Sequence, residues 1–140
     1  MAVVNDYMES YGLPDDRQIH KMIKLTREGI SYEEFELMAE NSAFTFNQWR
    51  QFLHVSERTL QRYKKDNKNF EPLRTEKILE LLLLQKHSKN VFEKQEHFKA
   101  WLNTNCLSLG NIPPISLLDS SFGIQIVKDE LGRIEHGIFA

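Results

Sequence analysis

Residues 46–63 read FNQWRQFLHVSERTLQRY, and this stretch decides the fold. Thr45 and Gln48 have the spacing of a capping box, which predicts the start of a short helix, and Ser56 is a good N-cap for a second one. Two short helices joined by a tight turn are a helix-turn-helix pattern, in which the second helix enters the major groove of DNA. An αα-hairpin with a basic second helix also occurs in proteins that never touch DNA, so the pattern alone leaves that alternative open.

Side chains at the start of the second helix are the candidates for contacting DNA. Arg and Gln carry forked donors that match the edges of guanine and adenine, whereas Lys suits phosphate, for which any cation serves. Leu60 and Tyr63 should face the other way and pack on Trp49 and Phe52. We therefore expect DNA contacts from Gln48, Ser56, Arg58, Thr59, Gln61, Arg62, Lys64 and Lys65.

Two residues depart from the usual helix-turn-helix pattern. Arg50 stands where the close approach of the two helices usually requires a small residue. His54 stands in the turn, where Gly is usual because that residue tends to need a positive φ. His adopts this conformation less freely than Gly does. The departures leave room for an adaptor that binds only protein and has lost DNA recognition.

Charge is segregated along the chain, although the net charge is only −2. Residues 1–44 hold four Lys/Arg and nine Asp/Glu, residues 45–77 hold eight and four, and residues 78–140 hold six and seven. A basic island in an otherwise acidic chain suggests a local polyanion site, although a solvated helix face would have the same composition.

The remaining sequence also reads as helical, which makes the predicted fold class all-α. Ser31 and Glu34 have the spacing of another capping box. The leucine-rich helix expected over about 75–87 is apolar around most of its circumference, so it should be buried between two subdomains or two subunits. Apolar spacing further predicts helices over about 15–28 (with Ile19, Met22 and Ile23 on one face), over a segment containing Phe92, Phe98 and Trp101, and over about 121–136, with a loop over 103–114.

Composition excludes several other classes of protein. The longest apolar run, Leu81 to Leu84, is far shorter than the roughly 20 residues of a membrane-spanning helix, and the first residues lack a secretory signal pattern. The single cysteine, Cys106, excludes an internal disulfide and fits a reducing cytosol. No histidine pair has metal-binding spacing and no nucleotide-binding glycine motif is present. We therefore expect a cytoplasmic protein with no metal, no cofactor and no catalytic residues.

Residues 98–139 read FKAWLNTNCLSLGNIPPISLLDSSFGIQIVKDELGRIEHGIF. This string resembles the C-terminal toxin-binding domain of the Xre/MbcA/ParS antitoxins, the partners of RES-domain toxins. Asn111 departs from the family pattern, in which a small residue is common. The resemblance rests on Trp101 and Leu102, Leu109 and Gly110, Pro114, Leu117 and Leu118, Gly123, Val127, Leu131 and residues 133–137, with Arg58, Thr59 and Leu60 in the upstream helix.

The resemblance implies a type II antitoxin that neutralises its toxin directly and represses its own operon. RES toxins resemble ADP-ribosyltransferases and deplete NAD, and the family's C-terminal region covers the entrance to their NAD pocket. Glu135 and the carboxylate of Ala140 could mimic the anionic parts of the dinucleotide, with Phe139 as an apolar anchor; a steric plug is the alternative. The toxin-binding residues implied are Arg133, Ile134, Glu135, His136, Gly137, Ile138, Phe139 and Ala140.

The organisation implied is an acidic helical segment (1–30), an Xre-like helix-turn-helix DNA-binding domain (31–85) and a small helical toxin-binding domain (86–140). The implied partners are a RES-domain toxin and operator DNA, with no membrane. A homodimer is expected because operators are commonly palindromic. The alternative is a stand-alone helix-turn-helix regulator whose C-terminal domain serves dimerisation or ligand sensing.

Overall fold

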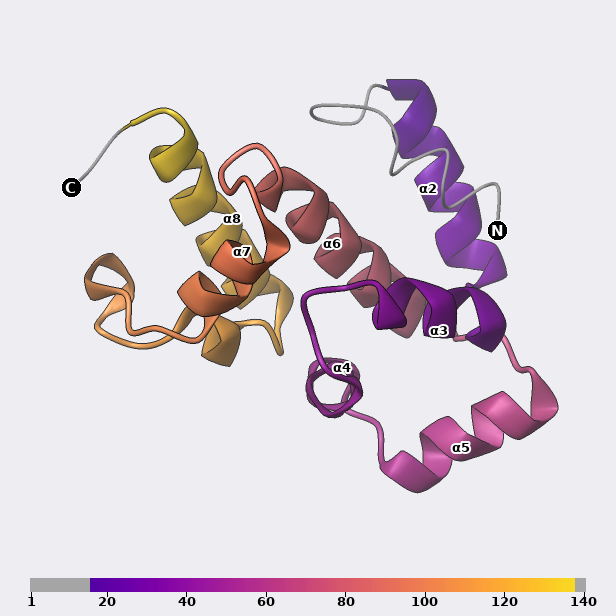
Figure 1. The fold of residues 1–140 in the computed structure, drawn as a ribbon. Coiled ribbons are helices and arrows are strands. Elements are labelled where there is room, and N and C mark those ends of the chain that lie inside the picture. Colours follow the sequence, from indigo (N-terminus) through magenta and orange to yellow (C-terminus); the bar gives the residue numbers. More distant parts are fainter. Residues whose placement is uncertain (1–15, 138–140) are drawn as a thin grey trace.

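The computed structural model describes residues 16–137, and every regular element in this range is helical (Figure 1). This confirms the predicted all-α class. Two isolated antiparallel bridges join loops, Ser31 with Asn69 and Cys106 with Ile112. The helices are α2 (Asp16–Glu28), α3 (Tyr32–Glu40), α4 (Phe46–Leu53), α5 (Glu57–Asp66), α6 (Pro72–Ser88), α7 (Gln95–Leu102) and α8 (Ser121–Glu135), with the 3-10 turns η1 (Leu107–Leu109) and η2 (Pro114–Leu117) between α7 and α8.

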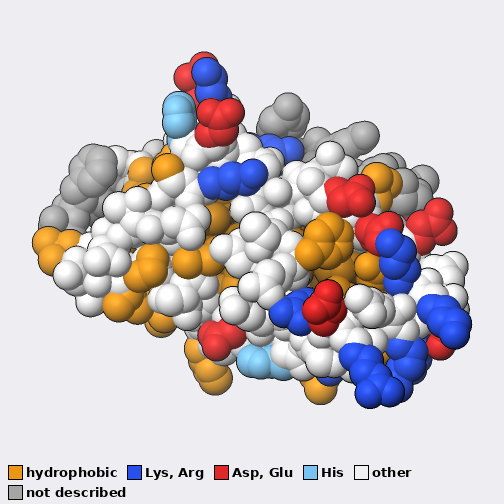
Figure 2. All heavy atoms as spheres, turned by 60° about the horizontal axis from the view of Figure 1, so that its bottom comes forward, with side chains coloured by type: hydrophobic (Ala, Val, Ile, Leu, Met, Phe, Trp, Pro, Cys, Tyr) orange, Lys and Arg blue, Asp and Glu red, His pale blue; other side chains and the backbone are white. Residues whose placement is uncertain are grey.

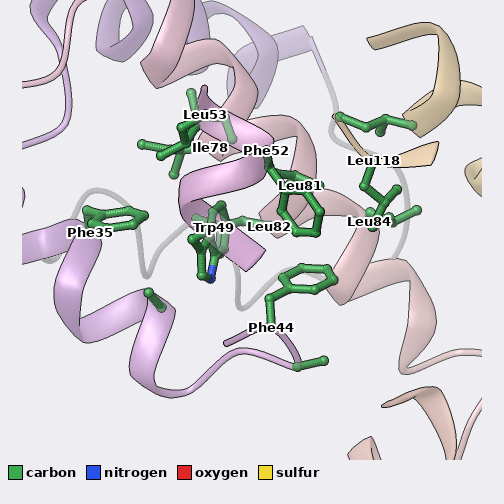
Figure 3. Close-up of a cluster of buried hydrophobic side chains, with 14 of the residues drawn as sticks. Phe35, Phe44, Trp49, Phe52, Leu53, Ile78, Leu81, Leu82, Leu84 and Leu118 are labelled. Carbon is green, nitrogen blue, oxygen red and sulfur yellow. The ribbon is translucent and has the colours of Figure 1, made fainter. Parts of the chain in front are cut away.

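Helix α6 is the centre of the molecule, with α2 and α4 packed against it from one half and α8 from the other. Its Ile78 and Leu81 have no exposed surface. Figure 3 shows Phe44 and Trp49 on one side of the helix and Leu118 beside its Leu84 on the other. One continuous core therefore runs through both halves, and the apolar circumference of α6 is used within the chain. The helix begins at Pro72 rather than near residue 75, because proline fits the first turn of a helix.

Side-chain caps start the helices at the positions that the sequence indicates. Thr45 Oγ1 accepts from the backbone N–H of Gln48, and Gln48 Oε1 accepts from that of Thr45, which completes the capping box. Ser56 caps α5 by accepting from the N–H of Thr59. Ser31 likewise accepts from the N–H of Glu34 at the start of α3. These caps fix where α3, α4 and α5 begin.

The structure corrects one local expectation and refines two others. Phe92 lies in the loop before α7 rather than in the helix. Its ring packs against those of Phe98 and Trp101 from this loop, at centroid distances of 5.8 Å each, so its apolar character serves the core without a helix. Ile19 and Ile23 are 43% and 41% exposed, because α2 turns Leu25 and Met22 toward the core instead. The loop expected over 103–114 contains the short turn η1 and leads directly into η2, which packs on α8.

Candidate functional site

The turn between α4 and α5 contains the backbone conformation that the sequence predicts. His54 has φ +55° and ψ +45°, in the left-handed region. Its N–H donates to the carbonyl of Gln51, and the N–H of Val55 donates to that of Arg50. The turn thus ends α4 and redirects the chain within the three residues before α5, as a helix-turn-helix requires.

Helix α5 presents one exposed face of basic and amide side chains. Arg58, Gln61, Arg62 and Lys65 follow the spacing i, i+3, i+4 and i+7 and are all exposed. Leu60 and Tyr63, only 7% and 4% exposed, lie on the opposite face against the core, as predicted. Figure 2 shows Lys and Arg gathered at the right of the molecule, where α5 lies. The arrangement can place cations and forked donors against a polyanion.

The other predicted DNA-binding residues already make contacts within the chain. Gln48 belongs to the capping box of α4, and the Ser56 hydroxyl donates to Thr59 Oγ1 in addition to capping α5. Lys64 Nζ lies 3.2 Å from Glu36 Oε2 on α3. The structure therefore brings four of the eight predicted residues together on one free face. Of the other four, Gln48, Ser56 and Thr59 take part in helix caps, and Lys64 pairs with a neighbouring helix.

The side chain of Arg50 lies along its own helix. Its guanidinium donates to Asn47 Oδ1, three residues earlier in α4. The same side chain lines a shallow groove of about 430 Å³ that lies between α4 and η2, together with His54, Ile115 and Asp119. The expected conflict with close helix approach is thus avoided by the orientation of the side chain.

The ring of His54 links the helix-turn-helix to the C-terminal half. Its Nε2 donates to the backbone carbonyl of Asp119, at 2.8 Å, immediately before α8. A carbonyl can only accept, so this contact defines Nε2 as the protonated nitrogen. The sequence marks His54 as unusual for its position, but a partner 65 residues away leaves no local signal.

A polar cluster anchors α5 to the start of α6. The Tyr63 hydroxyl donates to Glu71 Oε2 at 2.6 Å, and Arg74 Nη1 lies 2.6 Å from Glu71 Oε1. Arg74 also donates to the carbonyls of Leu53 and His54 at the end of α4. Burial raises the pKa of Glu71, but the hydrogen bond from Tyr63 and the nearby Arg74 outweigh it, so this pKa lies below its usual value. The cluster thus ties the end of α4, the middle of α5 and the start of α6 together.

In the C-terminal half, two of the predicted toxin-binding side chains are engaged within the chain. Arg133 Nη1 lies 2.6 Å from Glu130 Oε2 one turn earlier. Glu135 Oε2 lies 2.6 Å from His87 Nε2 of α6. Ile134 is half-buried, whereas His136 and Gly137 are exposed. Ile138, Phe139 and Ala140 lie outside the described residues.

The described part of the chain holds no group of three or more metal-ligating side chains. None of its helices combines the length and apolar character that crossing a membrane requires.

These features define an all-helical protein with a basic helix-turn-helix and a second helical half that shares its core. Residues 21–83 match the family model of the antitoxin Xre-like helix-turn-helix domain, and residues 88–137 match that of the antitoxin Xre/MbcA/ParS C-terminal toxin-binding domain. The chain belongs to the Xre/MbcA/ParS antitoxin family.

A curated relative supports the same assignment. The protein named Antitoxin Xre from Yersinia enterocolitica serotype O:8 / biotype 1B (strain NCTC 13174 / 8081) is 31% identical over 88 residues, which are 61% of this chain and 59% of the relative. The chain thus spans about three fifths of the length of the curated relative that it matches.

Proposed function

We propose that this chain is a type II antitoxin that binds and neutralises the toxin encoded beside it and represses its own operon. The observation that carries the proposal is the order of the two family matches, a helix-turn-helix domain followed by a toxin-binding domain on one shared core. The exposed face of α5 and the end of α8 lie at opposite sides of the molecule (Figure 1), so DNA and a toxin can bind at the same time.

The toxin is a RES-domain protein that depletes NAD, and residues 133–140 cover the entrance to its active site. The resemblance of the C-terminal string to the family supports this finer assignment. The operator is read by Arg58, Gln61 and Arg62, with Lys65 on phosphate, which the free face of α5 supports. The chain acts as a homodimer, without an enzymatic activity of its own, in the cytoplasm.

The organisation that we propose keeps the three segments 1–30, 31–85 and 86–140, with the last two joined by α6. The boundary at residue 85 falls inside this helix, near its end. The first segment contributes α2, which packs on α6.

Co-expression with the adjacent gene tests the neutralising activity. We expect the neighbour to arrest growth alone and lower cellular NAD, the full-length chain to restore both, and a chain truncated after Gly137 to bind the toxin more weakly. Full neutralisation by the truncated chain would show that residues 138–140 are not needed to cover the active site of the toxin. A harmless neighbour that does not copurify would refute the antitoxin and favour a stand-alone regulator.

Binding to the promoter DNA of the operon tests repression separately. We expect the triple variant Arg58→Ala, Gln61→Ala, Arg62→Ala to lose operator binding while it still neutralises the toxin, because α5 and the end of α8 lie far apart. Unchanged operator affinity would mean that another surface binds DNA or that this chain binds only protein.

A further inference from the structure

The last turn of α8 is held against the last turn of α6 by one short polar contact. His87 Nε2 and Glu135 Oε2 are 2.6 Å apart, although the two residues are 48 positions apart in the sequence. Both side chains are largely covered, with 21% and 30% of their surface exposed. A hydrogen bond to a carboxylate at this distance is among the strong ones, and partial burial protects it from solvent.

The imidazole of His87 is oriented by this single bond. Its other nitrogen, Nδ1, is buried and has no hydrogen-bond partner within the described residues. A buried polar atom without a partner is unfavourable, so the ring holds this orientation at the expense of Nδ1. What the orientation achieves is the contact of Nε2 with Glu135.

Glu135 is the last residue of α8, and the chain leaves the helix directly after it. The N–H of His136 donates to the carbonyl of Gly132, and that of Gly137 donates to the carbonyl of Ile134. Gly137 has φ +69°, which turns the chain away from the helix axis. The position of the last turn therefore decides where the following residues begin.

We propose that His87 is a positioning residue for toxin neutralisation. Through Glu135 it fixes the last turn of α8, to which the proposed toxin-binding residues at the end of the chain are attached. The proposal rests on the proposed function of the tail. A helix end that is already held in place loses less conformational freedom on binding than one that frays, which raises the affinity for the toxin.

The proposal also assigns a role to the Glu135 carboxylate. This group holds the helix end on α6 and does not imitate an anionic part of the dinucleotide. Its partner is His87 both in the free chain and in the complex with the toxin.

A double-mutant cycle between His87 and the tail separates positioning from a general structural role. We expect His87→Ala to weaken toxin binding about tenfold in the full-length chain and less than twofold in a chain truncated after Gly137, since the truncated chain lacks the last three of the residues that the end of α8 positions. Equal losses in both backgrounds, or no loss in the full-length chain, would overturn the proposal.

Three further variants sharpen this cycle. His87→Gln places an amide donor near the position of Nε2 and should restore most of the affinity. His97→Ala, on the exposed face of α7, is the matched control and should change nothing. Glu135→Ala should cause no further loss in the His87→Ala background, and a further loss there would mean that Glu135 contacts the toxin itself.

Amide hydrogen exchange of the free protein gives a readout that needs no toxin. We expect His87→Ala to speed exchange at His136 and Gly137 at least fivefold while the amides of Val127 and Leu131, in the buried part of α8, keep their rates. Unchanged exchange rates at His136 and Gly137 would contradict the proposal that His87 holds the end of α8 in place. A wild-type chain that binds no toxin would instead refute the proposed function, and the exchange rates would still decide whether His87 fixes this turn.

Discussion

Two glycines of α8 lie in opposite surroundings. A Cβ atom at Gly123 would lie 1.7 Å from the carbonyl oxygen of Leu117, whereas one at Gly132 would meet nothing within 4 Å. Gly123→Ala must push α8 away from η2, and we expect it to lower the free energy of unfolding by about 2 kcal/mol or more. Gly132→Ala should raise it by up to about 1 kcal/mol, because Ala favours helix.

Urea unfolding of the two variants measures this difference. Equal effects of the two substitutions would mean that η2 moves freely away from α8. From the sequence, both glycines are unfavourable in a helix and indicate close approach of another backbone, which the structure shows for Gly123 and not for Gly132. The carbonyl that requires Gly123 belongs to the preceding turn η2, and its position depends on how that turn packs.

His54 illustrates a residue whose conformation the sequence predicts and whose partner it does not. Its φ of +55° is the value expected for a helix-turn-helix turn. We expect His54→Val to lower the free energy of unfolding by about 1–2 kcal/mol relative to His54→Gly, because a β-branched residue is strained there and Gly is not. Both variants lose the hydrogen bond to Asp119, so the difference between their free energies of unfolding reflects the backbone conformation at residue 54. Equal stability would show that the turn changes its conformation.

At the scale of the element, α5 offers two adjacent lysines in different situations. Lys65 lies on the free face, whereas Lys64 pairs with Glu36. Lys65→Ala should weaken operator binding and reduce the slope of log affinity against log salt by about 1, as loss of one phosphate contact does. Lys64→Ala should change the slope less, because its charge is partly neutralised. A larger effect of Lys64→Ala would mean that the Lys64 side chain separates from Glu36 when the protein binds DNA.

The first turn of α6 provides a pH-dependent contribution to stability. The pKa of Glu71 lies below its usual value of 4.5 because the Tyr63 and Arg74 contacts outweigh burial. A carboxyl whose folded pKa is depressed stabilises the fold above its unfolded pKa, and this contribution is lost as the pH falls through the folded value. In Glu71→Gln, the free energy of unfolding should fall less steeply below about pH 4.5 than in the wild type.

The exposed Glu76→Gln in the same helix is the control for this pH titration. If the free energy of unfolding of Glu71→Gln falls as steeply at low pH as that of the wild type, other carboxyls cause the loss of stability.

The helices themselves could largely be predicted from the sequence, since caps and apolar spacing are local. The Glu71 cluster could not, because it joins the ends of three helices, and their mutual angles depend on the whole core.

At the scale of the whole molecule, one hydrophobic core continues through α6 and joins the helix-turn-helix half to the C-terminal half. The rings of Phe44 and Phe98, one from each half, lie 6.4 Å apart, and Leu118 of the second half reaches Leu84 of α6. The apolar circumference of α6 already indicates a helix that is buried on several sides. It does not tell whether a second half of the same chain or a second subunit covers it.

A shared core should make the two halves unfold together, which fluorescence can test because each half holds one tryptophan. Trp49 is fully buried beside α6, and Trp101 is half-buried in the C-terminal half. In Trp101→Phe, fluorescence of Trp49 reports on the helix-turn-helix half, whereas far-UV circular dichroism reports on all helices. We expect the two urea transitions of this variant to coincide, as they do for a single cooperative unit. Leu81→Ala should shift both transitions together and lower the free energy of unfolding by about 2–5 kcal/mol, since Leu81 has no exposed surface. Two separate transitions would instead favour independent domains on either side of residue 85, with α6 as a connector between them. In that case, toxin binding at one end of the molecule would not stabilise the proposed DNA-binding half.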